Sequence, residues 1–240
     1  NDLPNLYSAG LLYFMALMGT SLNLLFTGRV LAIRMQKFLH CLSVGEVMGS
    51  LYGPVVRTIT AVSGIAGSLG YIAIQFQVIS RVLALTLGLQ GPPVMILAAT
   101  IVIMYSSFGG IKAVTLTDVL QIVTFSMFIP IISLYIWKSI PQAGTQVATV
   151  LSGAVFDQRE VDWTAKLMKF SVLFIYYYIP ALGLPISQRI LMARDARQAR
   201  SAFTNAAGIN ALMLASLAWL AVLLLADNPK LEPSQLIPYL

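Results

Sequence analysis

The sequence predicts an all-α membrane protein with six transmembrane helices. Hydrophobic residues make up 58% of the 240 residues and charged residues only 10%, whereas a soluble globular domain carries about 25% charged residues. The charges leave six uncharged stretches of 19 to 30 residues, at 3–28, 58–80, 82–111, 119–137, 170–188 and 201–226. Each stretch is long enough to cross about 30 Å of hydrocarbon as a helix that rises 1.5 Å per residue.

These stretches are expected to be helices because the backbone in lipid must satisfy its own hydrogen bonds, and no alternation typical of barrel strands is present. We place the six spans at about 6–28, 55–80, 93–110, 117–137, 170–188 and 201–226. Together they form a single partial transmembrane domain over 1–240. The longest connector, 138–169, is expected to be an external loop.

The basic residues predict the orientation of these spans. The net charge is +6, but Lys and Arg lie in the connectors rather than on one solvated face, so we exclude nucleic acid as a partner. The side reached after the first span receives nine of them: Arg29, Arg34, Lys37, Arg57, Lys112, Arg189, Arg194, Arg197 and Arg200. The opposite side receives six: Arg81, Lys138, Arg159, Lys166, Lys169 and Lys230.

The side with nine basic residues is therefore expected to be cytoplasmic, with both ends of this chain outside. The expected location is the cell membrane, and specifically the bacterial inner membrane. The connector 38–53 is too polar to span, and its Ser-Val-Gly-Glu sequence at 43–46 predicts a short helix at the cytoplasmic surface.

Residues that could support catalysis are scarce. The single histidine, His40, stands beside the single cysteine, Cys41, whereas a metal site needs three or four convergent ligands. No pair of carboxylates lies within a predicted span. Gly64-x-x-Gly67-x-x-Gly70 resembles a dinucleotide-binding motif only in its letters, and we expect it to let helices approach closely. We therefore expect no enzymatic activity, no catalytic residue, no metal site and no cofactor apart from a coupling ion.

Two segments predict local features of the spans. Gly109 and Gly110 end one span and permit a sharp bend, and Asp118 follows at the start of the next span. This carboxylate either stabilises a helix N-terminus or attracts a cation that leaves toward the cytoplasm. In the sixth span, Asn205 and Asn210 are expected to donate hydrogen bonds to neighbouring helices.

The fifth span is expected to be broken. Residues 176–185 read Tyr-Tyr-Tyr-Ile-Pro-Ala-Leu-Gly-Leu-Pro, and two prolines and a glycine do not continue an undisturbed helix. A break at membrane depth lines a cavity or is covered by protein. Alternatively, the three tyrosines form a belt at the membrane interface.

Three segments, in order, resemble the sodium:solute symporter family, which includes sodium/proline, sodium/pantothenate and sodium/glucose transporters. Residues 105–121 resemble its aromatic-x-x-Gly-Gly-x-x-Ala-Val-x-x-Thr-Asp-x-x-Gln signature, with Tyr105 as the aromatic residue at a spacing that varies among relatives. Residues 43–53 resemble its short cytoplasmic helix. Residues 187–200 resemble its Gln-Arg-x-x-x-Ala-(Lys/Arg)-Asp-x-x-x-Ala stretch, which follows a broken helix.

The resemblance implies that the six helices are part of a fold of two inverted five-helix repeats, with substrate and sodium near the membrane midplane. The chain would supply the second to seventh core helices, and the principal sodium site would lie on helices outside this sequence. The implied function is sodium-coupled secondary active symport of a small organic solute by alternating access. The implied partners are this solute, the sodium ion as coupling ion, and the lipid bilayer.

The resemblance also assigns site residues. Asp118 matches the carboxylate implicated in sodium passage to the cytoplasm. Ser21 falls at a substrate contact of sugar-transporting relatives, but Met18 replaces their glutamate. We therefore expect an amino acid, a vitamin or a carboxylate rather than a sugar.

Three further substrate contacts follow from the same resemblance. Tyr71 falls near a substrate-binding asparagine of a relative, and Gln75 lies one turn further along that helix face. Tyr178 is the candidate aromatic gate over the substrate, next to the expected helix break.

Two alternatives remain open. Some bacterial sensor histidine kinases carry a similar symporter-like membrane domain that senses a solute, and a kinase-type ATP-binding domain downstream would favour this function. The chain is alternatively an inactive fragment that lacks the main sodium site.

Overall fold

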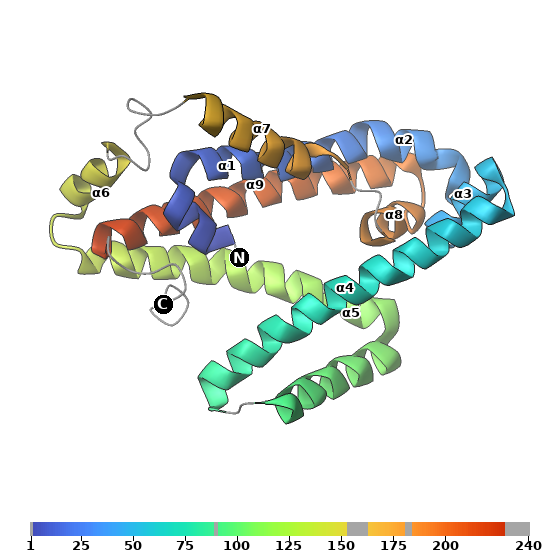
Figure 1. Ribbon diagram of the computed structural model, residues 1–240, viewed down its shortest axis with the longest axis horizontal. Helices are drawn as coiled ribbons and strands as arrows, with labels where there is room; N and C mark the ends of the chain where they lie inside the picture. The colour runs from blue at the N-terminus through green and yellow to red at the C-terminus, as the bar shows by residue number, and fades with distance from the viewer. Residues whose placement is uncertain (1, 89–90, 153–162, 181–183, 229–240) are drawn as a thin grey trace. The chain divides into compact units, whose positions relative to one another are not determined.

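The computed structural model describes residues 2–88, 91–152, 163–180 and 184–228, and every regular element in these ranges is a helix (Figure 1). In chain order the elements are α1 (Asp2–Phe26), the π-helix η1 (Thr27–Leu31), α2 (Ala32–Arg34), the 3-10 helix η2 (Met35–Phe38), α3 (Val44–Tyr52), α4 (Pro54–Leu87), α5 (Pro92–Ser139), α6 (Ala143–Ser152), α7 (Trp163–Tyr178), α8 (Leu184–Leu191) and α9 (Ala196–Asp227).

The helices agree with the predicted all-α membrane class. Among the described residues, five helices are long and apolar enough to cross a membrane: Leu12–Phe38, Pro54–Ala84, Pro92–Gly110, Thr115–Ser139 and Ala196–Asp227. They correspond to five of the six predicted spans. The remaining span, 170–188, contains two shorter helices, α7 and α8, in place of one continuous helix. The count of six spans and the inverted repeat stay predictions.

The first span extends further than the charges indicate. Helical structure continues from α1 through η1, α2 and η2 to Phe38, so Arg29 and Arg34 lie on helix rather than in a connector. Long basic side chains can keep their charge in water while their stems cover apolar surface. A charged residue therefore does not by itself end a helix.

Contacts divide the chain into two compact units. The first comprises the described residues of Asn1–Leu39, Phe125–Ala181 and Met192–Leu240, and the second those of His40–Thr124 and Leu182–Leu191. In the first unit α1 packs along both α9 and α7, and α6 packs against α9 (Figure 1). In the second unit α3 packs against α4 and touches α8. The single partial domain over 1–240 stays a prediction.

Apolar side chains hold the first unit together in two clusters. One joins α1 to α9 through Leu6, Tyr13, Leu17, Leu214 and Ala221. The other joins the C-terminal part of α5 and helix α6 to residues 220–226 of α9. Helix α6 lies within the connector 138–169, so this predicted external loop contains a helix.

Close backbone approach adds to these clusters at Gly28. A Cβ atom at this position would lie 2.8 Å from the Cβ of Phe203 on α9, which is closer than real Cβ contacts. The absence of a side chain therefore lets η1 approach α9 directly.

The short helix predicted from residues 43–46 is present as α3. Its N-terminus is capped by Ser43, whose hydroxyl accepts a hydrogen bond from the N–H of Glu46 at 3.2 Å. The Glu46 carboxylate in turn accepts from the N–H of Leu42 at 2.8 Å, close to a capping box. Gly53 has a φ of 90°, which ends α3, and Pro54 begins α4.

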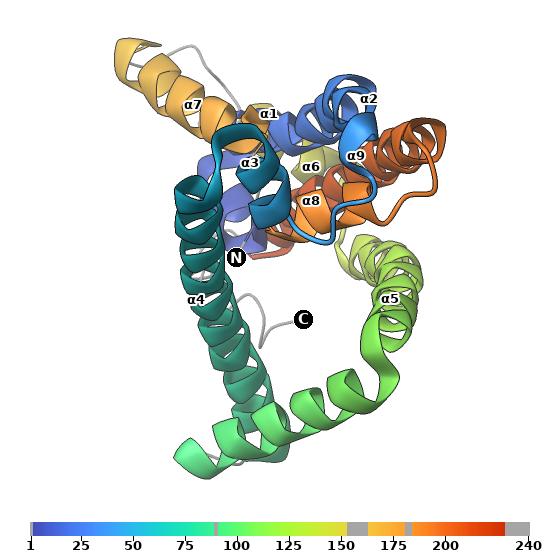
Figure 2. The same cartoon turned by 90° about the vertical axis from the view of Figure 1, so that its right-hand side faces the viewer.

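The bend predicted at the paired glycines is also present. Gly110 interrupts α5 with a φ of 56° and a ψ of −155°, and the helix changes direction there (Figure 2). Only glycine adopts this backbone region readily. Helix then continues beyond Gly110 to Ser139 and includes Asp118.

Candidate functional site

Helix α7 ends where the two prolines and the glycine predict a break. The N–H of Ile179 donates to the carbonyl of Ile175 at 2.9 Å, and the helix stops after Tyr178. Pro180 has no N–H that could continue the ladder to Tyr176. The carbonyls of the last turn of α7 therefore need other donors.

Asn23 of α1 supplies two of these donors. Its Nδ2 donates to the carbonyl of Tyr177 at 3.2 Å and to the carbonyl of Ile179 at 3.1 Å. The hydroxyl of Thr27, which is fully buried, donates to Oδ1 of Asn23 at 3.2 Å. One amide side chain thus connects α1, η1 and the broken end of α7.

A second amide connects α1 to α9. Nδ2 of Asn210 donates to the hydroxyl oxygens of Thr20 at 2.8 Å and of Ser21 at 2.9 Å. The Thr20 hydroxyl itself donates to the carbonyl of Leu17 at 2.8 Å. The predicted hydrogen bond from Asn210 to a neighbouring helix is therefore confirmed, whereas Asn205 is exposed and its hydrogen bond stays a prediction.

These groups form one feature, which we call the polar seam: the side chains of Thr20, Ser21, Asn23, Thr27 and Asn210 together with the backbone carbonyls at 177 and 179. Ser21 and Thr27 are buried, in an apolar surrounding of α1, α7 and α9. Buried polar groups in such surroundings are retained when they are hydrogen-bonded to one another. The polar seam joins α1 to α9 and to the end of α7.

Aromatic rings line the α7 side of the polar seam. The ring of Tyr178 stacks on that of Phe174 with centroids 5.9 Å apart, and lies 6.3 Å from the ring of Phe26 on α1. The hydroxyls of Tyr13 and Tyr177 are 3.0 Å apart. Tyr178 remains 37% exposed, so its ring has room to move.

Two of the four predicted substrate contacts lie in the first unit, and their role in substrate binding stays a prediction. Ser21 and Tyr178 both belong to the α1, α7 and α9 group of the first unit. Tyr71 and Gln75 are exposed on α4 in the second unit, and their role in substrate binding stays a prediction. Sequence reasoning missed Asn23, although an amide between hydroxyl residues in an uncharged span was a usable signal.

Asp118 has a partner that the sequence analysis did not identify. Its Oδ2 lies 2.9 Å from Nη2 of Arg189 on α8, and both side chains are partly exposed, 42% for Asp118 and 67% for Arg189. Asp118 follows Gly110 by about two helical turns. The N-terminal dipole of a helix acts mainly within its first turn. The ion pair, rather than a helix end, is therefore the main electrostatic feature at this carboxylate.

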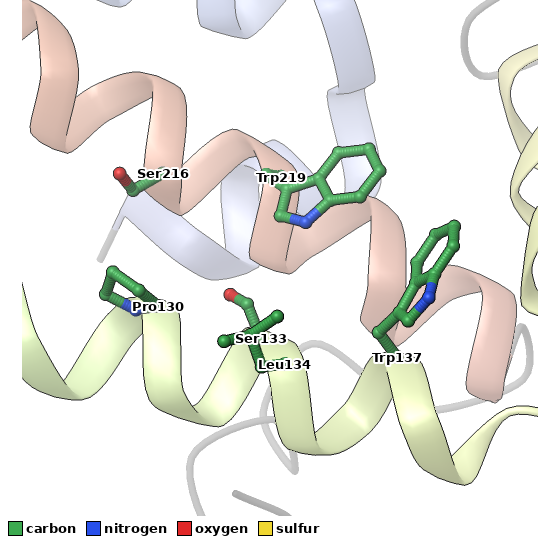
Figure 3. Close-up of a pocket in the computed structure, with 6 residues that line it drawn as sticks. All are labelled: Pro130, Ser133, Leu134, Trp137, Ser216 and Trp219. Atoms are coloured by element: carbon green, nitrogen blue, oxygen red, sulfur yellow. The ribbon is translucent and has the colours of Figure 1, made fainter.

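A separate pocket of about 440 Å³ lies between the C-terminal part of α5 and α9 (Figure 3). The rings of Trp137 and Trp219 stack beside it with centroids 5.8 Å apart. Ser133, on the side of α5 that faces α9, has a buried hydroxyl without a hydrogen-bond partner. The pocket lining contains none of the predicted site residues: it comprises Pro130, Ser133, Leu134, Trp137, Ser216 and Trp219.

The described residues show no group of three or more His, Cys, Asp or Glu side chains that could hold a metal ion. Cys41 is buried just before α3, and this burial raises the pKa of its thiol, with a further increase from the Glu46 carboxylate. A thiol with a raised pKa carries less of the reactive thiolate at neutral pH.

Comparisons of the chain with protein-family models, with curated proteins and with solved structures each found no match. The resemblance to the sodium:solute symporter family therefore rests on the three sequence segments given above.

Proposed function

We propose that the chain is the central part of a sodium-coupled symporter for a small organic solute, with the solute site beside the polar seam. The observation that supports this most is the end of α7 at Tyr178, inside an apolar segment, where one α1 side chain, Asn23, binds the carbonyls at 177 and 179. Helices interrupted at membrane depth are where secondary transporters bind substrates and ions.

The chemistry of this region suits a polar solute. Ser21 and Asn210 offer a hydroxyl and an amide, and Tyr178 offers an aromatic face on α7, which also packs against α1. Neutral hydrogen-bonding groups and one ring suit a small polar solute, and the choice among solutes rests on Met18. Met18 provides no carboxylate for sugar hydroxyls, so a sugar is the less favoured substrate.

For the coupling ion, we assign Asp118 to the route by which sodium leaves toward the cytoplasm. A partly exposed carboxylate attracts cations, and Asp118 is paired with the cationic side chain of Arg189. A passing sodium ion would compete with Arg189 for this carboxylate. The inward sodium gradient would then drive uptake by alternating access. The principal sodium site is expected on helices outside these 240 residues.

The test is uptake by the complete gene product, reconstituted into proteoliposomes with an inward sodium or potassium gradient. Radiolabelled proline, pantothenate, a monocarboxylate and glucose form the substrate panel. We expect accumulation of one of the first three solutes with sodium only. Uptake at equal rates in potassium would reject sodium coupling, and binding without accumulation would favour the sensing domain of a histidine kinase.

A further inference from the structure

The two carbonyls that Asn23 binds stand on either side of Tyr178 in the chain. Tyr177 and Ile179 are the residues before and after it, and both carbonyl oxygens accept from the same amide nitrogen. The backbone of Tyr178 is therefore held at both ends by one side chain of α1. Any rotation of this short segment has to break at least one of these hydrogen bonds.

The orientation of the Asn23 amide is determined by its partners. Its nitrogen faces two carbonyls, which only accept, and its oxygen faces the Thr27 hydroxyl, which donates. Exchanging the oxygen and nitrogen of the amide would leave the two carbonyls without donors. The two carbonyls thus decide which way round the amide stands, the Thr27 hydroxyl holds its oxygen in place, and Asn23 in turn holds the end of α7.

Close packing of α1 against α7 restricts this region further. A Cβ atom at Gly19 would lie 3.2 Å from the Cβ of Tyr177 and 3.3 Å from the backbone nitrogen of Tyr178. The glycine lets the two helices approach, and Asn23 lies one turn further along α1. Two successive turns of α1 therefore contact the segment around Tyr178, one through Gly19 and the next through Asn23.

We propose that Asn23 is a positioning residue for Tyr178. Its amide keeps the end of α7 in the broken form, and this sets where the tyrosine ring stands over the solute site. The inference rests on the proposed function, because it takes Tyr178 as the gate. Loss of the hydrogen bonds from this amide would let the Tyr178 ring leave its position on Phe174. This would reduce the affinity for the solute more than the turnover rate.

The test uses the complete gene product with Asn23→Ala, which removes the amide, and Thr27→Val, which keeps the shape but removes the hydroxyl that holds the amide oxygen. We expect KM for uptake to rise at least about fivefold in Asn23→Ala, because the net loss of one hydrogen bond produces that factor and the amide donates two. Thr27→Val is expected to raise KM less, and kcat is expected to change little in both. Asn205→Ala, at an exposed amide of α9, is the matched control.

A second measurement does not depend on transport. A Tyr178→Cys thiol, placed in a Cys41→Ala background, is modified with a methanethiosulfonate reagent in the purified protein in nanodiscs. We expect modification at least about fivefold faster when Asn23→Ala is added, and a smaller increase when Thr27→Val is added. Asn205→Ala should leave this rate unchanged.

The two measurements separate the possible failures. Modification rates that are equal with and without Asn23 would overturn the positioning role, even if uptake is sodium-dependent. Faster modification in a protein that shows no uptake would support the positioning role and reject the proposed function. If Asn23→Ala does not fold, Thr27→Val decides the question alone, since it keeps the branched shape of the side chain.

Discussion

Ser133 illustrates how a single buried hydroxyl affects stability. Its oxygen is buried without a hydrogen-bond partner, although most buried polar groups are paired. Such a group costs about 1–3 kcal/mol of desolvation without compensation. We expect Ser133→Ala to raise the free energy of unfolding by about 1 kcal/mol, measured by circular dichroism in detergent.

The matched control for Ser133 is Ser216, which lines the same pocket but donates to the carbonyl of Leu212 at 2.9 Å. Ser216→Ala should leave stability unchanged or lower it slightly. A fall in unfolding temperature for Ser133→Ala, larger than that for Ser216→Ala, would show that the Ser133 hydroxyl has a partner in the working protein.

Substitutions in the ion pair of Asp118 with Arg189 are expected to affect stability and transport differently. Exposed pairs of this kind contribute about 0–1 kcal/mol to stability because water and salt screen them. We therefore expect the free energies of unfolding of Asp118→Asn and Arg189→Gln to lie within about 1 kcal/mol of that of the parent protein.

The same two variants test the role of Asp118 in transport. If sodium passes Asp118, then Asp118→Asn should lower sodium-dependent uptake, and Arg189→Gln should leave it intact or raise it. Equal losses of uptake in both variants would instead indicate a structural role for the pair.

At the scale of single elements, the bend of α5 depends on one glycine. The backbone angles of Gly110 fall in a region that costs about 1–3 kcal/mol for other residues. A Cβ atom there would meet nothing within 4 Å, so steric contact adds nothing to this cost. We expect Gly110→Ala to destabilise the protein by about 2 kcal/mol, measured as the shift in thermal unfolding.

Gly67 in α4 provides the control for Gly110. It has helical geometry and also has nothing within 4 Å of its would-be Cβ atom. Gly67→Ala should therefore stabilise the helix by about 0.5–1 kcal/mol. A destabilisation as large as that of Gly110→Ala would show that another helix covers this face of α4 in the complete protein.

Local chemistry explains which elements could be predicted. The bend at Gly110, the end of α7 before Pro180 and the short helix α3 each follow from residues next to one another in the chain. The span ends were less accurate because hydrogen bonds between neighbouring turns continue past a charged residue. This is why helix extends through Arg29 and Arg34 to Phe38.

Pairings between distant residues were not predictable from the sequence. Asn23 and the Tyr177 carbonyl are 154 positions apart, and Arg189 and Asp118 are 71 positions apart. Their meeting depends on which helices pack together, and an uncharged span can pack in several ways. The resemblance pointed to Ser21 and Tyr178 as substrate contacts, a role that stays a prediction, and the amide that links α1 to the end of α7 was missed.

At the scale of the whole molecule, the predicted orientation can be tested by labelling. In a Cys41→Ala background, we expect an Arg197→Cys thiol to resist a membrane-impermeant maleimide in intact cells and to react after permeabilisation. A Thr149→Cys thiol, on the exposed side of α6, should react in both conditions. Reaction of Arg197→Cys in intact cells would reverse the orientation and remove the cytoplasmic exit assigned to Asp118.

The parent protein supplies the baseline for this labelling. Its only thiol, Cys41, is buried and has a raised pKa, so it should react slowly at neutral pH. Fast reaction of the parent protein would mean that the segment before α3 opens in solution.

Gly28 has a consequence for how this chain tolerates change. Even a single methyl group there would push η1 and α9 apart, because Phe203 already occupies the space. Thr27, which is hydrogen-bonded to Asn23, is the adjacent residue, so this displacement would also disturb the hydrogen bonds at the end of α7. A substitution at Gly28, far from Tyr178 in sequence, would thus shift the position of the tyrosine. It would do so by displacing the backbone and not by changing a contact with the solute.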